Sequence, residues 1–201
     1  MTWISTIAYE DADPRLKKIY NRVKGPDGRI DNILMSHSLR PASLQGHMTL
    51  YKGVLHHSGN ALPKWLLEAI GVYVSLLNGC DYCVEHHYEG MLRLQEDPPR
   101  SAAIREALTA QAPDQAFSGR DLAIMQYVYT LTVTPTKVTL SQVDQMRAHG
   151  MDDGEVLEVN QVAAYFSYAN RTVLGLGVNT KGDELGLSPN DNDDPGNWSH
   201  T

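Results

Sequence analysis

The chain has 201 residues, of which 42% are apolar and 20% are charged, the composition of an ordinary globular protein that is long enough to bury a core. Its formal net charge of −7 excludes the basic surface with which proteins bind nucleic acid or anionic lipid, so we expect neither as a partner. The sequence does not open with a signal-peptide pattern, and its longest apolar stretch is too short to span a bilayer, so we expect a cytoplasmic protein.

The first predicted helix begins near residue 14. Four residues there follow the i, i+3, i+4, i+7 spacing of an amphipathic helix: Leu16, Ile19, Tyr20 and Val23. The helical pattern returns between Ile33 and His57, with an interruption at Pro41. It returns again in KWLLEAIGVYVSLL, directly after Pro63, a residue that suits the start of a helix.

A break follows at Asn78-Gly79, because glycine readily adopts the left-handed conformation that ends helices. The next helix is predicted from about Cys80 to the sequence QEDPPR. The break permits this helix to fold back against the preceding one, which a single continuous helix would not do.

The second half of the chain also has helical periodicity, in SAAIREALTA and RDLAIMQYVYTLT. Two later helices begin with capping-box patterns, Thr139 with Gln142 and Asp152 with Glu155. Since no stretch alternates with period two between hairpin turns, we expect no strands. The predicted fold class is all-α.

We expect one helical domain over residues 1–201. Within it we distinguish an N-terminal helical extension (about 10–60), a core that carries the cysteines (about 63–95) and a polar C-terminal tail (about 186–201). The tail is expected either to be loose or to lie on a neighbouring subunit.

Both cysteines of the chain lie in NGCDYCVEHH, residues 78–87. Haem attachment of the c type requires a histidine where Val84 stands, and a thioredoxin-like motif requires a βαβ context that helical flanks do not offer. A zinc site with Cys80, Cys83 and His87 as ligands is a third interpretation, although no second ligand pair follows along the chain. The fourth is a redox-active dithiol.

The position of His87 favours the dithiol. It lies four residues after Cys83 and seven after Cys80, so it shares a helix face with both. The first turn of a helix stabilises a thiolate, and a nearby histidine can take up the thiol proton. His86 points about 100° away from His87 and is expected to be incidental.

Glu68 is the residue that could orient His87. Its apolar surroundings in WLLEAIGVYVSLL suggest burial, and a buried carboxylate without a partner is costly. If the following helix folds back, Glu68 can face His87. A glutamate at the solvent edge of its helix is an equally weighted alternative.

Other polar residues are given structural interpretations. His47, His56 and His57 have no cysteine or carboxylate at ligand spacing nearby, so we expect them to pack in the core or on the surface. Asn170 and Arg171 lie late in an apolar helix, where a cap or a hydrogen bond between helices is expected.

The order Glu68, Cys80-x-x-Cys83, His87 resembles that of the AhpD-like alkylhydroperoxidases, within the carboxymuconolactone decarboxylase superfamily. AYEDADPRLKKIYNRV near the N-terminus and the long segment from LTVTPTKV to TVLGLGV are similar to the same superfamily. DPGNWSH resembles the ending of a subgroup labelled peroxidase-related. The resemblance covers nearly the whole chain.

The resemblance implies an all-α protein that assembles into trimers or hexamers and acts as a thiol-dependent peroxidase without a cofactor. By position, Cys83 would attack the peroxide and Cys80 would resolve the sulfenic acid to a disulfide, with His87 and Glu68 as the proton relay. A thiol protein or a lipoyl-type protein would then act as reductant. From the residues alone, the order of attack stays open, because Cys80 lies nearer the helix start.

Tyr82 departs from the best-known branch, which has a histidine at this place, so one step of that branch's proton relay is in question. The decarboxylase branch lacks the dithiol, which argues against lactone decarboxylation. Two further functions are carried forward: a disulfide reductase or redox sensor, and a helical oligomer with a structural metal at Cys80, Cys83 and His87.

Overall fold

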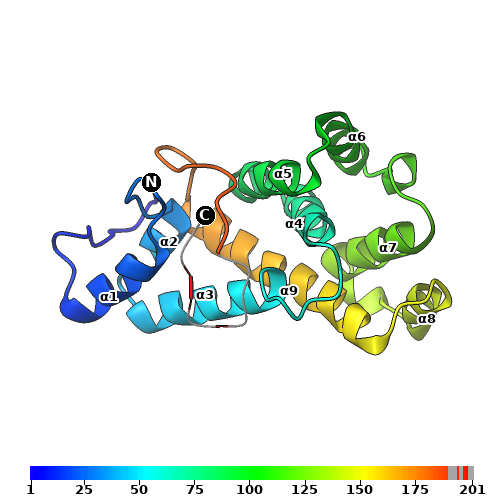
Figure 1. Cartoon of the computed structure of the whole chain (residues 1–201), viewed down its shortest axis with the longest axis horizontal. Helices are drawn as coiled ribbons and strands as arrows, with labels where there is room; N and C mark the ends of the chain where they lie inside the picture. Colours follow the sequence, from blue (N-terminus) through cyan, green and yellow to red (C-terminus); the bar gives the residue numbers. More distant parts are fainter. Residues whose placement is uncertain (190–193, 195–196, 199–201) are drawn as a thin grey trace.

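The computed structural model describes residues 1–189, 194, 197 and 198 (Figure 1). These residues form α-helices and two short 3-10 helices, with no strand among them, which confirms the all-α prediction. The elements are α1 (Pro14–Val23), α2 (Asn32–Ser36), α3 (Pro41–Leu55), α4 (Lys64–Asn78), α5 (Asp81–Gln95), α6 (Pro98–Thr109), η1 (Pro113–Gln115), α7 (Gly119–Val133), η2 (Pro135–Lys137), α8 (Leu140–Ala148) and α9 (Asp153–Leu176).

Helix α4 is the centre of the packing, since it contacts α3, α5, α6, α7 and α9. The long helix α9 runs along most of the molecule and joins the α1–α3 end to the α7–α8 end (Figure 1). The two helices approach closely at Gly71, where a Cβ atom would lie only 2.2 Å from the ring of Phe166. An apolar core therefore backs the helix that carries Glu68.

The local signals read from the sequence set the helix boundaries. Gly79 has φ of 69°, the left-handed conformation, and ends α4. Cys80 is the N-cap of α5, and α5 folds back onto α4 as expected. Both capping boxes are formed, one at the start of α8 and one at the start of α9. Pro63 differs slightly from expectation, because it is the N-cap of α4 rather than a residue within it.

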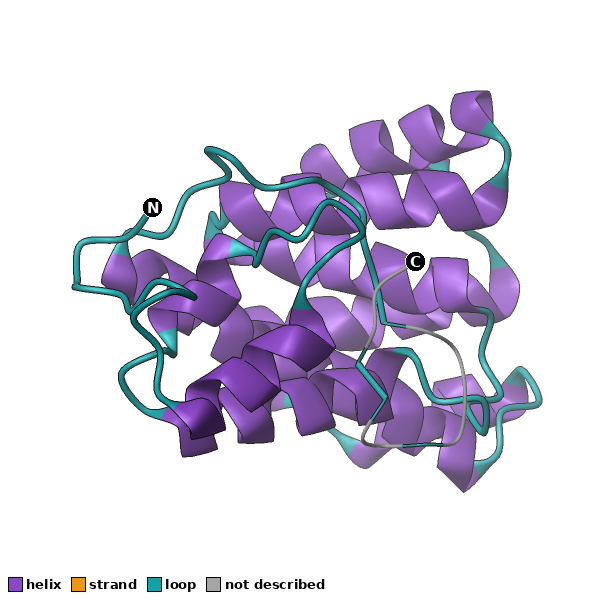
Figure 2. Ribbon diagram, turned by 60° about the vertical axis from the view of Figure 1, so that its left-hand side comes forward, coloured by secondary structure: helices purple, strands orange, loops and turns teal. Residues whose placement is uncertain are grey.

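The chain after α9 turns back along the helices (Figure 2). Leu185 and Gly186 accept hydrogen bonds from Arg93 of α5 through their carbonyl oxygens. Trp198 is buried, with the Arg22 guanidinium 3.7 Å from the centre of its ring. The described parts of the predicted tail thus lie on their own chain, whereas 190–193, 195–196 and 199–201 are outside the described residues.

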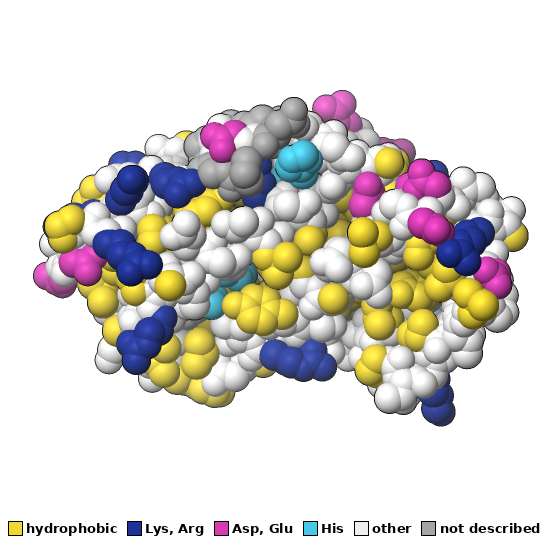
Figure 3. Space-filling model, turned by 90° about the horizontal axis from the view of Figure 1, so that it is seen from below, with side chains coloured by type: hydrophobic (Ala, Val, Ile, Leu, Met, Phe, Trp, Pro, Cys, Tyr) yellow, Lys and Arg dark blue, Asp and Glu magenta, His cyan; other side chains and the backbone are white. Residues whose placement is uncertain are grey.

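Several apolar side chains face solvent, among them Leu140 and Leu157, which are 69% and 57% exposed. Figure 3 shows one face on which apolar side chains are interspersed with lysine and arginine. Assembly into trimers or hexamers stays a prediction, as does the division into extension, core and tail. Among the described residues, none of the helices has both the length and the apolar character needed to cross a membrane.

Candidate functional site

The two cysteines form a close, buried pair of free thiols. Cys80 precedes the first residue of α5 and Cys83 lies within its first turn, which places their Sγ atoms 3.1 Å apart. The exposed fraction is 0% for Cys80 and 2% for Cys83. The pair is therefore shielded from bulk solvent but close enough for one sulfur to attack the other after oxidation.

The two thiols differ in acidity. The pKa of Cys80 is lowered, chiefly because its sulfur is hydrogen-bonded to Cys83, and burial only partly opposes this effect. The pKa of Cys83 is raised well above its ordinary value by the same hydrogen bond, by burial and by the charge of Cys80. The first thiolate of the reduced pair is thus centred on Cys80, and Cys83 requires a base in order to react.

His87, on the next turn of α5, is the candidate for such a base. His87 Nδ1 is 2.6 Å from Glu68 Oε2, so the expected contact between these two residues is present. Glu68 is 2% exposed and its other oxygen lies 3.7 Å from His56 Nε2. Gly90 packs against this carboxylate, and a Cβ atom there would make an ordinary van der Waals contact with it at 3.4 Å. The alternative of a solvent-edge glutamate is excluded.

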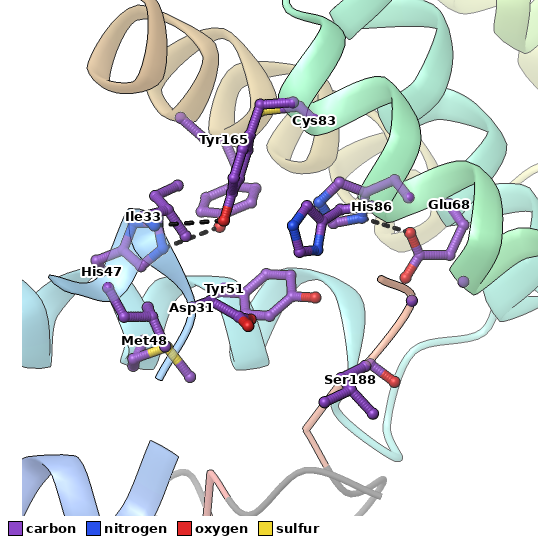
Figure 4. Close-up of a pocket in the computed structure, with 17 residues that line it drawn as sticks. Asp31, Ile33, His47, Met48, Tyr51, Glu68, Cys83, His86, Tyr165 and Ser188 are labelled. Atoms are coloured by element: carbon purple, nitrogen blue, oxygen red, sulfur yellow. Dashed lines mark hydrogen bonds and ion pairs between the residues drawn. The ribbon is translucent and has the colours of Figure 1, made fainter. Parts of the chain in front are cut away.

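A cavity between α2, α3, α5, α9 and residues 186–188 connects the thiol to this pair. Figure 4 shows Cys83, Tyr51, Glu68 and His86 around one space, with Ser188 of the C-terminal segment on its border. His87 also lines the cavity, whereas Cys80 does not. The cavity volume is about 50 Å³, room for roughly three or four water molecules. Only Cys83 of the two thiols can therefore meet a molecule held there.

The sequence predicts that His86 is incidental to the site, but the structure places it on the cavity wall. His86 is buried, its ring centre lies 4.5 Å from that of Tyr82, and its Nε2 is 3.4 Å from Asp183 Oδ2. His86 and His87 are consecutive in α5, and both line the cavity. The helix face that His87 shares with the two sulfurs is therefore not the only face of α5 at the site.

His47 and His56 are buried, as the packing interpretation expects, but both also lie at the site. His47 packs among aromatic rings, including those of Tyr51 and Tyr165, and lines the cavity. Burial lowers the pKa of His47 to about 3, so this imidazole is neutral at physiological pH.

The expected hydrogen bond between helices is made by Asn170 of α9, which donates to the Ser75 hydroxyl of α4 at 3.0 Å.

Tyr82 and Asp31 add two polar groups to the cavity wall. The Tyr82 hydroxyl donates to Asp183 Oδ2 at 2.7 Å and accepts from the Ile33 amide at 3.3 Å. Burial raises the pKa of Tyr82 well above its usual range, so the phenol stays protonated. The pKa of Asp31 is raised to about 6, mainly by burial and against the attraction of His86. No sequence motif indicated Asp31 or Asp183.

The described side chains at this site do not form a ligand set for a metal ion. Across the part of the chain that the structure describes, no three His, Cys, Asp or Glu side chains are arranged to hold one ion. The set Cys80, Cys83 and His87 is likewise not arranged to hold an ion. Their arrangement therefore gives no support to the structural-metal interpretation.

Comparison with known proteins agrees with the family resemblance over part of the chain. Residues 41–124, which contain the dithiol together with Glu68 and His87, match the model of the carboxymuconolactone decarboxylase family. No curated protein matches the sequence.

Solved structures share the fold at low identity. An uncharacterized peroxidase-related protein with an alkylhydroperoxidase AhpD core, from Ralstonia eutropha JMP134, superposes with a TM-score of 0.77 at 17% identity, covering 89% of this chain and 91% of that chain. An uncharacterized peroxidase-related protein from Silicibacter sp. TM1040 gives 0.75 at 20% identity, with the same coverage. The debrominase Bmp8, in complex with 2,3,4-tribromopyrrole, gives 0.70 at 17% identity, covering 89% and 91%. The fold is AhpD-like.

Proposed function

We propose that the protein is a dithiol peroxidase that reduces hydrogen peroxide or a small organic peroxide. The observation that carries this proposal is that Cys83 and the Glu68–His87 pair line one cavity. The Sγ atom of Cys80 lies 3.1 Å from that of Cys83. A nucleophile, a base and a group that orients the base are the parts that thiol catalysis needs. The AhpD-like fold and its peroxidase-related neighbours support the same chemistry.

In the proposed reaction, His87 accepts the Cys83 proton while the carboxylate of Glu68 holds its other ring nitrogen and stabilises the imidazolium. The Cys83 thiolate attacks the terminal peroxide oxygen, the O–O bond breaks, and the alkoxide takes a proton to leave as an alcohol, or as water when the substrate is hydrogen peroxide. Cys83 is now a sulfenic acid.

The Cys80 sulfur then attacks the Cys83 sulfur, and the hydroxyl group leaves as water after it takes the remaining proton. Two electrons have passed from the thiols to the peroxide, and a disulfide is left. An external dithiol, such as a lipoyl-type protein, reduces this disulfide and becomes a disulfide itself. The lowered pKa of Cys80 suits its role in the second step.

Trapping of the sulfenic acid tests the assignment. When Cys80→Ser protein is treated with one equivalent of peroxide and dimedone, we expect a dimedone adduct on Cys83, located by mass spectrometry. The matched variant Cys83→Ser should give no adduct on Cys80. An adduct on Cys80 alone would reverse the roles, and the absence of any adduct in either variant would contradict the peroxidase.

A second candidate is the reductive removal of bromine from a small aromatic ring. The cavity is lined by the aromatic side chains of Tyr51, Tyr165, His47 and His87, and the debrominase Bmp8 shares the fold. In that reaction the dithiol would become a disulfide, the C–Br bond would become C–H, and bromide and a proton would leave. Oxidation of the reduced protein by 2,3,4-tribromopyrrole but not by peroxide would favour this candidate, and oxidation by disulfides alone would favour a disulfide reductase or redox sensor.

A further inference from the structure

The C-terminal segment Asp183–Ser188, here called the C-terminal strap, borders the same cavity as Cys83. Gly186, Leu187 and Ser188 form part of the cavity wall. Figure 4 shows Ser188 on this strap, on the other side of the space from Cys83. The strap therefore bounds the room available to a molecule that reaches the thiol.

Hydrogen bonds accepted by Asp183 join the beginning of the strap to the first turn of α5, which carries Cys83. Asp183 Oδ2 accepts the 2.7 Å hydrogen bond from the hydroxyl of Tyr82, the residue directly before Cys83 in α5. The backbone N–H of Asn32 in α2 donates to both carboxylate oxygens of Asp183 at 3.1 Å, and His86 Nε2 lies 3.4 Å from Asp183 Oδ2. The carboxylate of Asp183 is thus shared by α2 and α5 and fixes the strap between them.

Backbone contact with α5 holds the next part of the strap. Arg93 donates to the Leu185 carbonyl at 2.9 Å and to the Gly186 carbonyl at 3.2 Å. Gly186 has φ of 77°, and a Cβ atom on it would lie 2.8 Å from the Glu89 Cβ and 3.0 Å from the Glu89 carbonyl carbon. The strap cannot lie this close to α5 with any other residue at position 186.

We infer that the C-terminal strap, fastened by the Tyr82–Asp183 hydrogen bond, determines the size of the substrate that reaches Cys83. This inference rests on the proposed peroxidase and narrows its substrates to compact peroxides. A cavity of about 50 Å³ accommodates hydrogen peroxide, whereas a peroxide that carries a phenyl ring, like the brominated ring of the second candidate function, needs the strap to move. Tyr82 is thus a positioning residue and takes no part in proton transfer.

Three variants loosen the strap in different ways: Tyr82→Phe removes the hydroxyl, Asp183→Asn removes the charge, and Gly186→Ala introduces the clash with Glu89. The measurement is the ratio of kcat/KM for cumene hydroperoxide to kcat/KM for hydrogen peroxide. We expect the ratio to rise about tenfold in each variant. A change in the reactivity of Cys83 would alter kcat/KM for both peroxides by the same factor, so it cancels in the ratio.

Tyr20→Phe is the matched control. The Tyr20 hydroxyl is buried and donates a hydrogen bond of the same 2.7 Å length, to the Ile7 carbonyl, but Tyr20 lies neither on the cavity nor on the strap. Its removal should leave the ratio unchanged. A merely structural effect of losing one buried tyrosine hydrogen bond would appear in both tyrosine variants.

An alkylation assay tests the strap independently of the peroxidase. In a Cys80→Ser background, the rate at which iodoacetanilide modifies Cys83 is divided by the rate for iodoacetamide, which has the same reactive group without the phenyl ring. A rise in this ratio without any peroxidase activity supports the strap and contradicts the proposed function. If both ratios stay at the wild-type value in all three folded variants, the inference is wrong.

Discussion

Cys80 and Cys83 differ in two respects that bear on reactivity. Their mutual hydrogen bond lowers the pKa of Cys80 and raises that of Cys83, yet only Cys83 lines the cavity. The sulfur on the cavity shared with Glu68 and His87 is therefore the weaker acid. In the proposed peroxidase this contrast gives His87 its role, since a thiol of high pKa reacts only after a base removes its proton.

Single cysteine variants should make this dependence visible. We expect the pKa of Cys80 in Cys83→Ala to lie above the first thiol pKa of the wild type, because the hydrogen bond that lowers it is gone. In Cys80→Ala, the pKa of Cys83 should lie below the second thiol pKa of the wild type. Thiolate absorbance near 240 nm, followed against pH, measures both. Identical titration of each thiol with and without its neighbour would contradict the assignment.

The Glu68–His87 pair gives a second prediction at this scale. His87→Gln should lower kcat/KM by about 10²-fold or more near neutral pH and shift the pH profile to higher pH, because Cys83 must then ionise without a base. Glu68→Gln should act in the same direction with a smaller loss.

The double variant should be little worse than His87→Gln, since Glu68 acts through His87. His57→Gln is the matched control, because His57 does not line the cavity. Additive losses from the two site variants would show that Glu68 has a role of its own.

At the scale of elements, the helices and their ends were largely predictable, because their signals are local. Apolar periodicity located α1 and α4, Gly79 marked the break, and both capping boxes formed. The pairing of Glu68 with His87 was also within reach, since a break between two adjacent helices constrains how they pack. Contacts between distant segments were not predictable. Tyr82 meets Asp183 across 101 positions, and the sequence provides no local signal for that pairing.

The contact between α4 and α9 offers a test of packing. Gly71→Ala should destabilise the protein by about 1–3 kcal/mol, because the added Cβ would overlap the Phe166 ring unless the helices separate. Gly46→Ala, in α3 with nothing near the added Cβ, should be neutral or stabilising by up to about 1 kcal/mol through helix propensity. Urea denaturation of the two variants measures the difference. Equal stabilities would mean that α4 and α9 are not in this close contact.

At the scale of the whole molecule, the core contains a cavity with ionisable groups in its largely apolar wall, and this placement affects stability. Asp31 lies in its wall, and burial, with the nearby charges of Asp183, Asp27 and Glu184, raises its pKa from 3.8 to about 6 in spite of His86. The folded state therefore favours the protonated acid. The stabilisation that Asp31 gives the folded state is complete below about pH 3.8, its ordinary pKa. It is lost as the pH rises through about 6, its pKa in the folded state.

Asp31→Asn should consequently raise the unfolding free energy at pH 7.5, by up to about 3 kcal/mol, because asparagine cannot ionise. The advantage should shrink as the pH falls toward 4.5. Thermal unfolding across this range, with the exposed Asp11→Asn as control, measures it. An advantage that is the same at every pH would point to a cause other than ionisation.

We propose above all that Cys83 attacks the peroxide and that Cys83 and Cys80 together supply its two electrons, and one titration tests this most directly. Reduced protein is mixed with hydrogen peroxide, and the free thiols and the remaining peroxide are counted as the reaction proceeds. We predict that the wild type loses two thiols for each peroxide consumed and forms the Cys80–Cys83 disulfide, whereas Cys83→Ser consumes none. Peroxide consumption by Cys83→Ser at the wild-type rate would contradict the account.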